Sequence, residues 1–318
     1  MDTESRILKV VNRMKYRENL LRPAAACLAI LAVATSVPAQ ACDTAAGDMS
    51  VQLLGSGGPR INRDRASTGY LVWIGSQGKI LVDAGGGVFL RFGQAGGRLE
   101  DLSLIAISHL HPDHVSDLPA LLWLSNLARK EPLPIAGPSG GEVTPDFQTF
   151  LVRLFDDKTG AFPLLGGTLR GAGMGVALDA VRLDVTNPQP LRVFEQSGIT
   201  VTALGVPHFN VPSLAYKVQT PNGTVVFGSD QTGTNPHFAA FAQGADILVM
   251  HLTIGAGETS PLHASPSVVG QVARDANARR LILSHIGQFD LDAAVAEVKK
   301  AYTGPVFVGA DLQCVRSR

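Results

Sequence analysis

The stretch Ser108-His109-Leu110-His111-Pro112-Asp113-His114 directly follows the apolar run Leu104 to Ile107. An apolar run of this kind predicts a buried strand, and residues two apart on an extended segment face the same way. The first two histidines of the stretch can therefore clamp one metal ion, while its aspartate and last histidine can meet a second ion where the chain turns. Core packing does not explain so many polar ligands side by side, so the stretch predicts a metal site.

The order H-x-H-x-D-H resembles the signature of the metallo-β-lactamase superfamily. In that family the other ligands follow later strands, and this chain has His208, Asp230 and His285 after three apolar runs in the same order. A lone histidine after a strand is more often structural, but three residues that fit the family order favour metal ligands. The resemblance implies one metal held by His109, His111 and His208, a second held by Asp113, His114 and His285, and Asp230 as the bridge between them.

Two zinc ions are the predicted cofactors, because imidazole and carboxylate groups suit zinc; manganese and iron stay open for the same mixed ligand set. Two close cations lower the pKa of a bridging water to about 7 and turn it into a hydroxide nucleophile. That hydroxide would attack phosphorus, sulfur or a carbonyl carbon. The ligand set therefore predicts a metal-dependent hydrolase of ester bonds.

Asp113 and His263 are the predicted catalytic residues. His263 begins the stretch His263-Ala264-Ser265-Pro266 and resembles the histidine that phosphodiesterase-like members place over the site as proton donor or oxyanion stabiliser. The alternatives for this residue are a cap of the following helix or a surface position without a catalytic role. Asp83 resembles the family aspartate that orients the histidines through hydrogen bonds. For His251, which ends an apolar run, a supporting role beside the metals and a purely structural role both stay open.

The later motifs narrow the branch of the superfamily. The chain has His208-x-x-x-Pro212, Gly228-Ser229-Asp230, His263-Ala264-Ser265 and Leu283-Ser284-His285 in this order. With these motifs, the chain from Val51 to Leu312 resembles the branch that contains transfer-RNA 3′-processing nuclease, class II cyclic-nucleotide phosphodiesterase and type II arylsulfatase. Asp230 within Gly228-Ser229-Asp230 argues against β-lactamase activity, because the antibiotic-cleaving branch usually lacks a bridging carboxylate there. We therefore expect hydrolysis of small sulfate or phosphate esters, and arylsulfatase and phosphodiesterase activity are not separated by sequence.

Charge balance shapes the expected partners. Lys+Arg and Asp+Glu both total 27, so no basic excess drives binding to a nucleic-acid backbone. Together with the missing basic arm of the nuclease, this predicts a small-molecule ester substrate and no nucleic-acid partner. The alternatives are a lactonase or other carboxylic-ester hydrolase, with Trp123 and Phe209 as walls of an apolar acyl pocket, or an inactive metal-binding scaffold.

The N-terminus resembles a secretory signal peptide. Basic residues precede the apolar run Ala24 to Val37, which is shorter than the roughly 20 residues of a membrane-spanning helix, and cleavage is expected after Ala41. This predicts a periplasmic or secreted protein without a membrane partner after cleavage. Cys42 and Cys314 can pair in an oxidising compartment, although free thiols or a lipid anchor at Cys42 stay open. A homodimer is expected only from the family.

The predicted fold class is α+β, an αββα four-layer sandwich of two mixed β-sheets flanked by helices, in one domain over residues 42–318. Short apolar or alternating runs predict strands in both halves, among them Ile199 to Val206 and Val306 to Val308. Helices are expected at Ser116 to Lys130, Thr144 to Phe155, Pro266 to Ala278 and Leu291 to Ala301. The segment between Phe155 and Leu191 is predicted to be a long loop that borders the active site.

Overall fold

Two seven-stranded β-sheets form the centre of the computed structural model, which describes residues 42, 45 and 47–318. The first sheet has the order β14-β1-β2-β3-β4-β5-β6, with β14 Cys314–Arg316, β1 Met49–Gly55, β2 Gly69–Ile74, β3 Gln77–Val82, β4 Leu104–Ala106, β5 Leu133–Pro138 and β6 Leu178–Leu183. The second has the order β13-β12-β11-β10-β9-β8-β7, with β13 Val306–Val308, β12 Leu281–Ser284, β11 Ile247–His251, β10 Gly223–Phe227, β9 Ser213–Thr220, β8 Ile199–Val206 and β7 Leu191–Gln196. Each sheet therefore comes almost entirely from one half of the chain.

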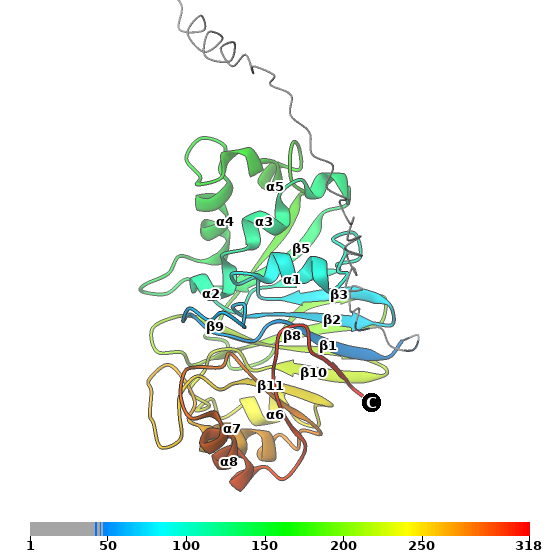
Figure 1. The fold of residues 1–318 in the computed structure, drawn as a ribbon. Coiled ribbons are helices and arrows are strands. Elements are labelled where there is room, and N and C mark those ends of the chain that lie inside the picture. Colours follow the sequence, from blue (N-terminus) through cyan, green and yellow to red (C-terminus); the bar gives the residue numbers. More distant parts are fainter. Residues whose placement is uncertain (1–41, 43–44, 46) are drawn as a thin grey trace, which may run out of the picture. The chain divides into compact units, whose positions relative to one another are not determined.

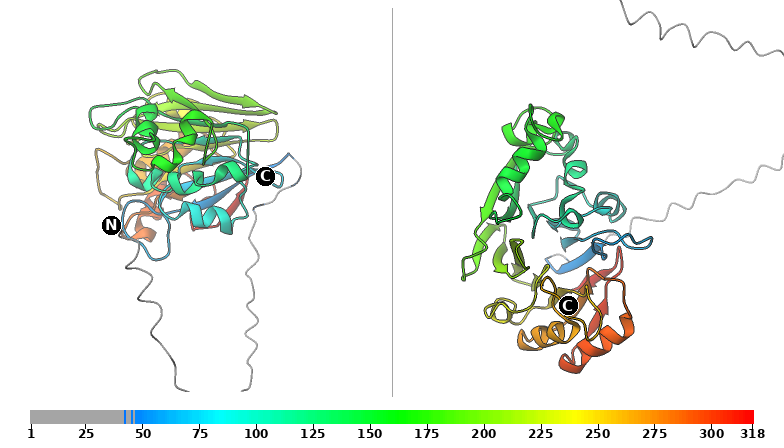
Figure 2. Two further views of the ribbon diagram at one scale, coloured as in Figure 1. Left: turned by 90° about the horizontal axis from the view of Figure 1, so that it is seen from above. Right: turned by 90° about the vertical axis from the view of Figure 1, so that its left-hand side faces the viewer.

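Helices cover the outer face of each sheet, as Figures 1 and 2 show. The first sheet carries α1 Val88–Gln94, α2 Pro112–Val115, α3 Leu118–Leu122, α4 Phe147–Phe155 and α5 Gly167–Arg170 on its side of the molecule, and the second carries α6 Phe238–Phe241, α7 Pro266–Asp275 and α8 Leu291–Ala301. Three separate apolar clusters fill the spaces between helices and first sheet, between the sheets, and between second sheet and helices. The predicted αββα sandwich is confirmed.

The central cluster joins the two sheets face to face. Alternate residues of β1 point into it, as Met49, Val51 and Leu53 do, and they meet buried residues of the second sheet such as Val225 and Val249. This alternation is what a strand with one face on each of two cores requires. Burial on both faces of the sheets explains why so many strands read as continuous apolar runs.

Strand direction brings the polar residues to one edge. Strands β10, β11 and β12 run parallel, and β9 lies antiparallel between β8 and β10, so β8 runs the same way as all three. In the first sheet β3 and β4 are also parallel. Residues that follow these strands can therefore gather at the carboxyl ends of the sheets, as in other folds with parallel strands.

Side-chain caps begin the longer helices. Ser265 caps α7 through Val268, Asp290 caps α8 through Ala293, and Asp146 caps α4 through the backbone of Thr149. These short polar side chains accept hydrogen bonds from the first free N–H groups of each helix. The predictions for all three helices hold to within a few residues at the ends.

Two segments differ from the sequence-based expectation. The predicted helix Ser116 to Lys130 is broken into α3 and a short 3₁₀ turn, Ser125–Leu127, because Leu124 adopts a left-handed conformation with φ 58°. The predicted loop after α4 contains α5 and the edge strand β6, which extends the first sheet beside β5. The prediction of a structureless loop there was wrong.

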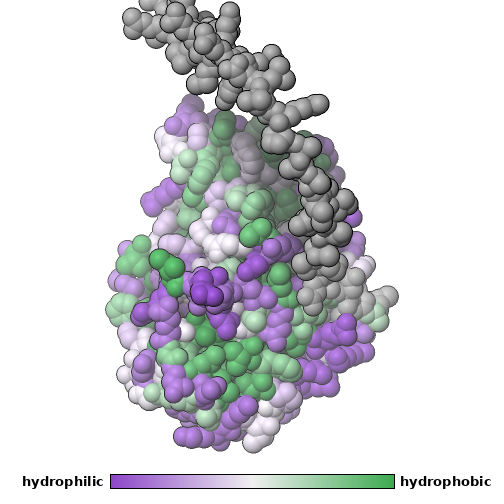
Figure 3. Space-filling model, viewed as in Figure 1, coloured by the Kyte–Doolittle hydropathy of each residue, from purple (hydrophilic) through white to green (hydrophobic). Residues whose placement is uncertain are grey.

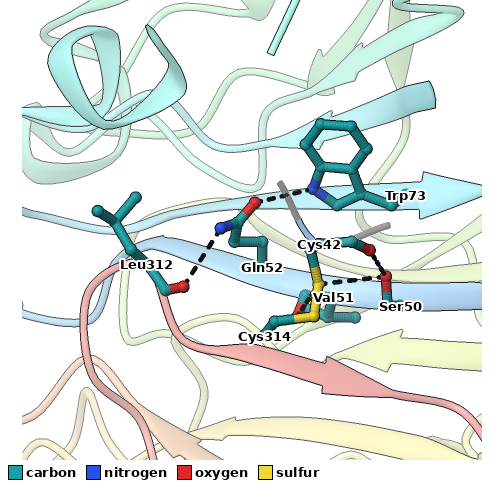
Figure 4. The surroundings of a disulfide bond; sticks show 7 residues. All are labelled: Cys42, Ser50, Val51, Gln52, Trp73, Leu312 and Cys314. Atoms are coloured by element: carbon teal, nitrogen blue, oxygen red, sulfur yellow. Dashed lines mark hydrogen bonds between the residues drawn. A yellow bond between two sulfur atoms is a disulfide. The ribbon is translucent and has the colours of Figure 1, made fainter. Parts of the chain in front are cut away.

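A disulfide joins Cys42 to Cys314 at the edge of the first sheet (Figure 4). It lies where β14 pairs with β1, and Cys42 is buried with its carbonyl accepting a hydrogen bond of 2.7 Å from the Ser50 hydroxyl. A thioether to a lipid would need the same sulfur atom, so this bond and a lipid anchor at Cys42 exclude each other.

The predicted signal peptide, residues 1–41, lies outside the described residues. Within the described part of the chain, no helix combines the length and the apolar character that crossing a membrane would take. Cleavage, export and the predicted location thus remain predictions.

Candidate metal centre

Eight of the polar residues that the sequence singles out meet at the carboxyl ends of the strands. Asp83 follows β3, and the stretch from His109 to His114 follows β4 and runs into α2, where Pro112 is the first helical residue. From the second sheet, three more follow β8, β10 and β12. These residues are His208, Asp230 and His285.

Three imidazoles and one carboxylate form the first donor set. The Nε2 atom of His109 lies 3.0 Å from Nδ1 of His111, which lies 3.4 Å from Nε2 of His208. The Oδ2 atom of Asp230 lies 3.5 Å from Nε2 of His208 and 3.8 Å from Nε2 of His109. Such close nitrogen atoms need a proton or a cation between them, and this spacing suits a metal ion.

A second donor set shares the same aspartate. The Oδ2 atom of Asp113 lies 3.1 Å from Nε2 of His285 and 3.6 Å from Nε2 of His114. The other oxygen of Asp230, Oδ1, lies 3.5 Å from Nε2 of His285 and 3.8 Å from Nε2 of His114. Each oxygen of this carboxylate therefore faces a different donor set.

Hydrogen bonds fix which nitrogen of each ring is free. The Nδ1 atom of His114 lies 2.8 Å from Asp83, and Nδ1 of His208 donates to the carbonyl of Leu262 at 2.8 Å. The Nδ1 atom of His285 lies 3.0 Å from the hydroxyl of Thr253. In all three rings Nε2 is left to face the centre, which is how ligating histidines are usually held.

The protonation and burial of the histidine rings also suit a metal site. Burial lowers the pKa of His109, His111 and His208, so all three rings are neutral and can offer a lone pair at pH 7. Burial also opposes charge on His114, but attraction and a hydrogen bond from Asp83 outweigh it and raise the pKa of His114 to about 9, so a metal at Nε2 would take the place of a proton on this ring. The Nε2 atom of His114 is buried and has no hydrogen-bond partner among the described residues. A cation is the natural partner for this atom.

The fold, the shared carboxylate and the two donor sets agree with a comparison of the sequence with known families. A family model described as "Beta-lactamase superfamily domain" matches residues 79–286. The chain belongs to the metallo-β-lactamase superfamily. The matched range includes every residue of both donor sets.

Relatives of this superfamily domain include several ribonucleases. Ribonuclease Z of Mycobacterium bovis (strain BCG / Pasteur 1173P2) is 27% identical over 298 residues, which cover 84% of this chain and 98% of the relative. Ribonuclease Z of Mycobacterium sp. (strain KMS) is 30% identical over 260 residues, covering 74% and 84%. Among solved structures, the metallo-β-lactamase fold protein YhfI of Bacillus subtilis aligns with a TM-score of 0.66 at 25% identity, covering 85% and 99%. Human tRNase Z, short form, has the same fold, with a TM-score of 0.65 at 19% identity, covering 84% and 98%.

These relatives overturn one prediction. We expected no nucleic-acid partner, whereas the superfamily relatives are named for the processing of RNA. The prediction failed because it used the net charge of the whole chain. A balanced total does not describe where the charges lie relative to a site. Figure 3 shows hydrophilic and hydrophobic residues side by side on one face of the molecule. Arg60 and Arg63 are exposed on a loop whose Gly58 packs against the ring of His285.

His263 lies close to both donor sets. Its ring centroid is 5.3 Å from that of His208 and 5.8 Å from that of His285, and its Nδ1 atom lies 3.8 Å from Oδ2 of Asp230. Burial lowers the pKa of His263 to about 4, so the ring is neutral at pH 7. In the described structure Nδ1 has no hydrogen-bond partner, which leaves it free for a ligand.

Several supporting residues were not predicted. Ser108 donates to both oxygens of Asp83, from its backbone N–H at 2.7 Å and from its hydroxyl at 2.8 Å. Tyr70 and Thr253 hold His251 and His285 through their hydroxyl groups. Thr253 stands just after β11, so a strand-end position could have suggested it. Tyr70 lies within an apolar strand and gave no signal.

Left-handed backbone is concentrated near the centre. Asp83, Ser229 and His285 have φ values of 60°, 59° and 52°. Non-glycine residues in this region cost about 1–3 kcal/mol each and persist where the surrounding structure holds them. Each of these residues lies just after a strand, where the chain turns. The left-handed backbone therefore occurs where polar side chains are directed to the centre.

Proposed function

We propose that this chain is a metal-dependent phosphodiesterase whose substrates include nucleic-acid or nucleotide diesters. The observation that carries the proposal is Asp230, whose two oxygens face different donor sets. A phosphodiester presents two non-bridging oxygens, and two adjacent cations are a recurrent solution for such groups. The relatives named Ribonuclease Z support the same bond type.

The ligand assignment follows the two donor sets. His109, His111, His208 and Asp230 would hold one divalent cation, with zinc as the first choice, and Asp113, His114, His285 and Asp230 would hold the second. Bound cations at these positions supply Lewis-acid polarisation of a substrate oxygen and lower the pKa of water.

The protein's own groups orient the reactants. Asp113 is 9% exposed, so its carboxylate can accept a proton from an attacking water at the mouth of the second donor set. The neutral ring of His263 can donate one N–H to an oxygen of the phosphate or to the departing oxygen. Asp83, Thr253 and Leu262 keep the ligating rings in the orientation that leaves Nε2 free.

The carboxylic-ester alternative receives no support from the pockets. Trp123 lines a pocket of about 610 Å³ with Phe89 and Phe162, whereas Phe209 lines another of about 430 Å³ with His208. The two aromatic residues that we expected as walls of one acyl pocket therefore belong to different pockets.

Turnover of matched chromogenic esters tests the proposal. Zinc- or manganese-loaded protein should cleave bis(p-nitrophenyl) phosphate, and p-nitrophenyl sulfate and a lactone should be much poorer substrates. A short oligoribonucleotide and cyclic AMP would then separate nucleic-acid from small nucleotide diesters. Asp113→Ala should abolish turnover, and His237→Ala, at an exposed position outside the centre, should retain it. Protein that binds two metals and cleaves no phosphodiester would disprove the proposal.

We also propose that the chain works in an oxidising compartment. The Cys42–Cys314 disulfide supports this location, since reducing compartments rarely keep structural disulfides. Thiol trapping in fractionated cells tests it, because a pair that is reduced in the cell would contradict the proposal.

A further inference from the structure

Phe209 is an exposed aromatic residue beside the metal centre. It directly follows His208, the residue is 70% exposed, and its φ is 51°. The backbone N–H of Val211 donates to the carbonyl of His208 at 3.1 Å, which closes a tight turn around the phenylalanine. Glycine is the residue that such a φ favours, and an exposed ring adds little to the core. Folding therefore does not explain a bulky aromatic side chain here.

Phe209 lines a pocket that also has His208, a member of the first donor set, in its wall. The residues that line this pocket of about 430 Å³ include His208, Phe209, Asn210, Glu142 and Thr186. The loop at Gly141 closes one wall, because a Cβ atom there would lie 2.7 Å from Pro212. Since His208 belongs both to this wall and to the donor set, the pocket lies next to the centre, where a substituent of a bound phosphate would extend.

The pocket that contains Trp123 offers a useful contrast. It holds exposed aromatic residues too, but the described residues that line it include no member of either donor set. Of these two aromatic pockets, the one at Phe209 is thus the one that adjoins the centre.

We propose that the pocket beside His208 is a subsite for an aromatic ring of the substrate, which stacks on Phe209. This inference rests on the proposed phosphodiesterase function and names the group attached to the phosphate. A flat apolar face with polar groups around it suits a nucleobase, because Asn210, Glu142 and Thr186 can bond to the ring edge while Phe209 covers its face. A plain aryl group shares the stacking but not the polar contacts.

Equilibrium binding tests the subsite without any need for turnover. With the zinc-loaded protein, adenosine 5′-monophosphate should bind about tenfold more tightly than ribose 5-phosphate, which lacks the base. Phe209→Ala and Phe209→Gly should both remove that advantage. The glycine variant also relieves the left-handed backbone, so a loss there cannot be attributed to misfolding. Phe162→Ala, at a 46% exposed phenylalanine of the other pocket, should keep the advantage.

A second ligand pair identifies the source of the ring. If phenyl phosphate gains over methyl phosphate as much as the nucleotide gains over ribose 5-phosphate, the subsite accepts aryl groups; a gain confined to the nucleotide identifies a nucleobase subsite. The inference is overturned if the wild type shows no advantage for either ring, if the Phe209 variants keep it, or if Phe162→Ala removes it. Diester cleavage with an unmoved binding ratio would contradict the subsite alone. A shifted ratio without cleavage would contradict the phosphodiesterase function alone.

Discussion

The Nδ1 atom of His251 contacts the Oδ1 atom of Asp230, and the Nε2 atom of the same ring lies 3.1 Å from the hydroxyl of Tyr70. This fully buried chain of contacts holds the shared carboxylate between the two donor sets. Supporting residues of this kind typically change metal affinity by about 10–100-fold. We expect His251→Ala to weaken zinc binding by that factor, and Tyr70→Phe to have a smaller effect in the same direction.

Competition with a chromogenic chelator measures this affinity. His237→Ala removes a histidine of the same chemistry from an exposed position and should bind zinc like the wild type. Unchanged affinity in His251→Ala would show that the ring only fills space.

Asp83 should prove more sensitive than an ordinary buried aspartate. Its carboxylate accepts two hydrogen bonds from Ser108 and pairs with His114. Asp83→Asn keeps the shape and suits the left-handed backbone, but it replaces one acceptor oxygen with a donor. We expect a loss of about 1–3 kcal/mol in the free energy of unfolding and weaker metal binding at the second donor set. Urea denaturation and metal analysis check both, with exposed Asp64→Asn as the neutral comparison.

Gly58 keeps room for a metal ligand. A Cβ atom at this position would lie 2.5 Å from Cε1 and 2.7 Å from Nδ1 of the His285 ring. Gly58→Ala should push the ring away from Thr253 and reduce diester turnover by about 100-fold, because small displacements of reacting groups are costly. Gly93→Ala, on the open side of α1 where nothing lies within 4 Å, should instead raise thermal stability slightly. Equal activity in the two variants would contradict the packing argument.

The disulfide should stabilise the domain substantially. It connects residues 272 positions apart and ties the start of the described domain to the edge strand β14. Removal of such a bond typically costs about 2–5 kcal/mol. Cys42→Ser with Cys314→Ser should therefore unfold at lower urea concentration than the oxidised wild type. Reductant should lower the midpoint of the wild type and leave that of the double variant unchanged.

Metal removal should destabilise the protein in proportion to metal affinity. A ligand present at about 1,000 times its Kd adds about 4 kcal/mol to the free energy of unfolding. Dialysis against a chelator should lower the melting temperature, and zinc should restore it. Asp230→Ala should show little response to either treatment, since it removes an oxygen from both donor sets. A chelator response as large as that of the wild type would contradict the shared role of Asp230.

Much of this architecture was predictable because the core is ordered by simple patterns. The bounds of β8 and β13 match the apolar runs that predicted them, since both strands read as uninterrupted apolar or alternating segments. The seven proposed ligands were predicted from the resemblance of their order to the superfamily signature, and the structure brings all seven together. His208, Asp230 and His285 follow strands closely, whereas Asp113 and His114 lie on α2, so strand-end position alone would not have identified the whole set.

Other features could not be read from local patterns. Strand β5 contains Pro134 and Pro138, which argue against a strand with neighbours on both sides, yet it pairs with β4 and β6. Strands β6 and β7 lie at sheet edges and are only partly buried, so their apolar pattern is weak. The break at Leu124 arises in a leucine-rich stretch that favours helix. In each case tertiary packing overrides the local preference.

Each donor set takes members from both sheets, so neither half of the chain contains a complete site. The segment up to β6 brings His109, His111, Asp113 and His114, and the remaining donors arrive only with the second sheet. During synthesis the first half therefore emerges with an incomplete histidine cluster, and both donor sets are complete only when the second sheet docks. We therefore expect metal binding to be a late event in the maturation of this protein, and a bound ion would connect its two halves.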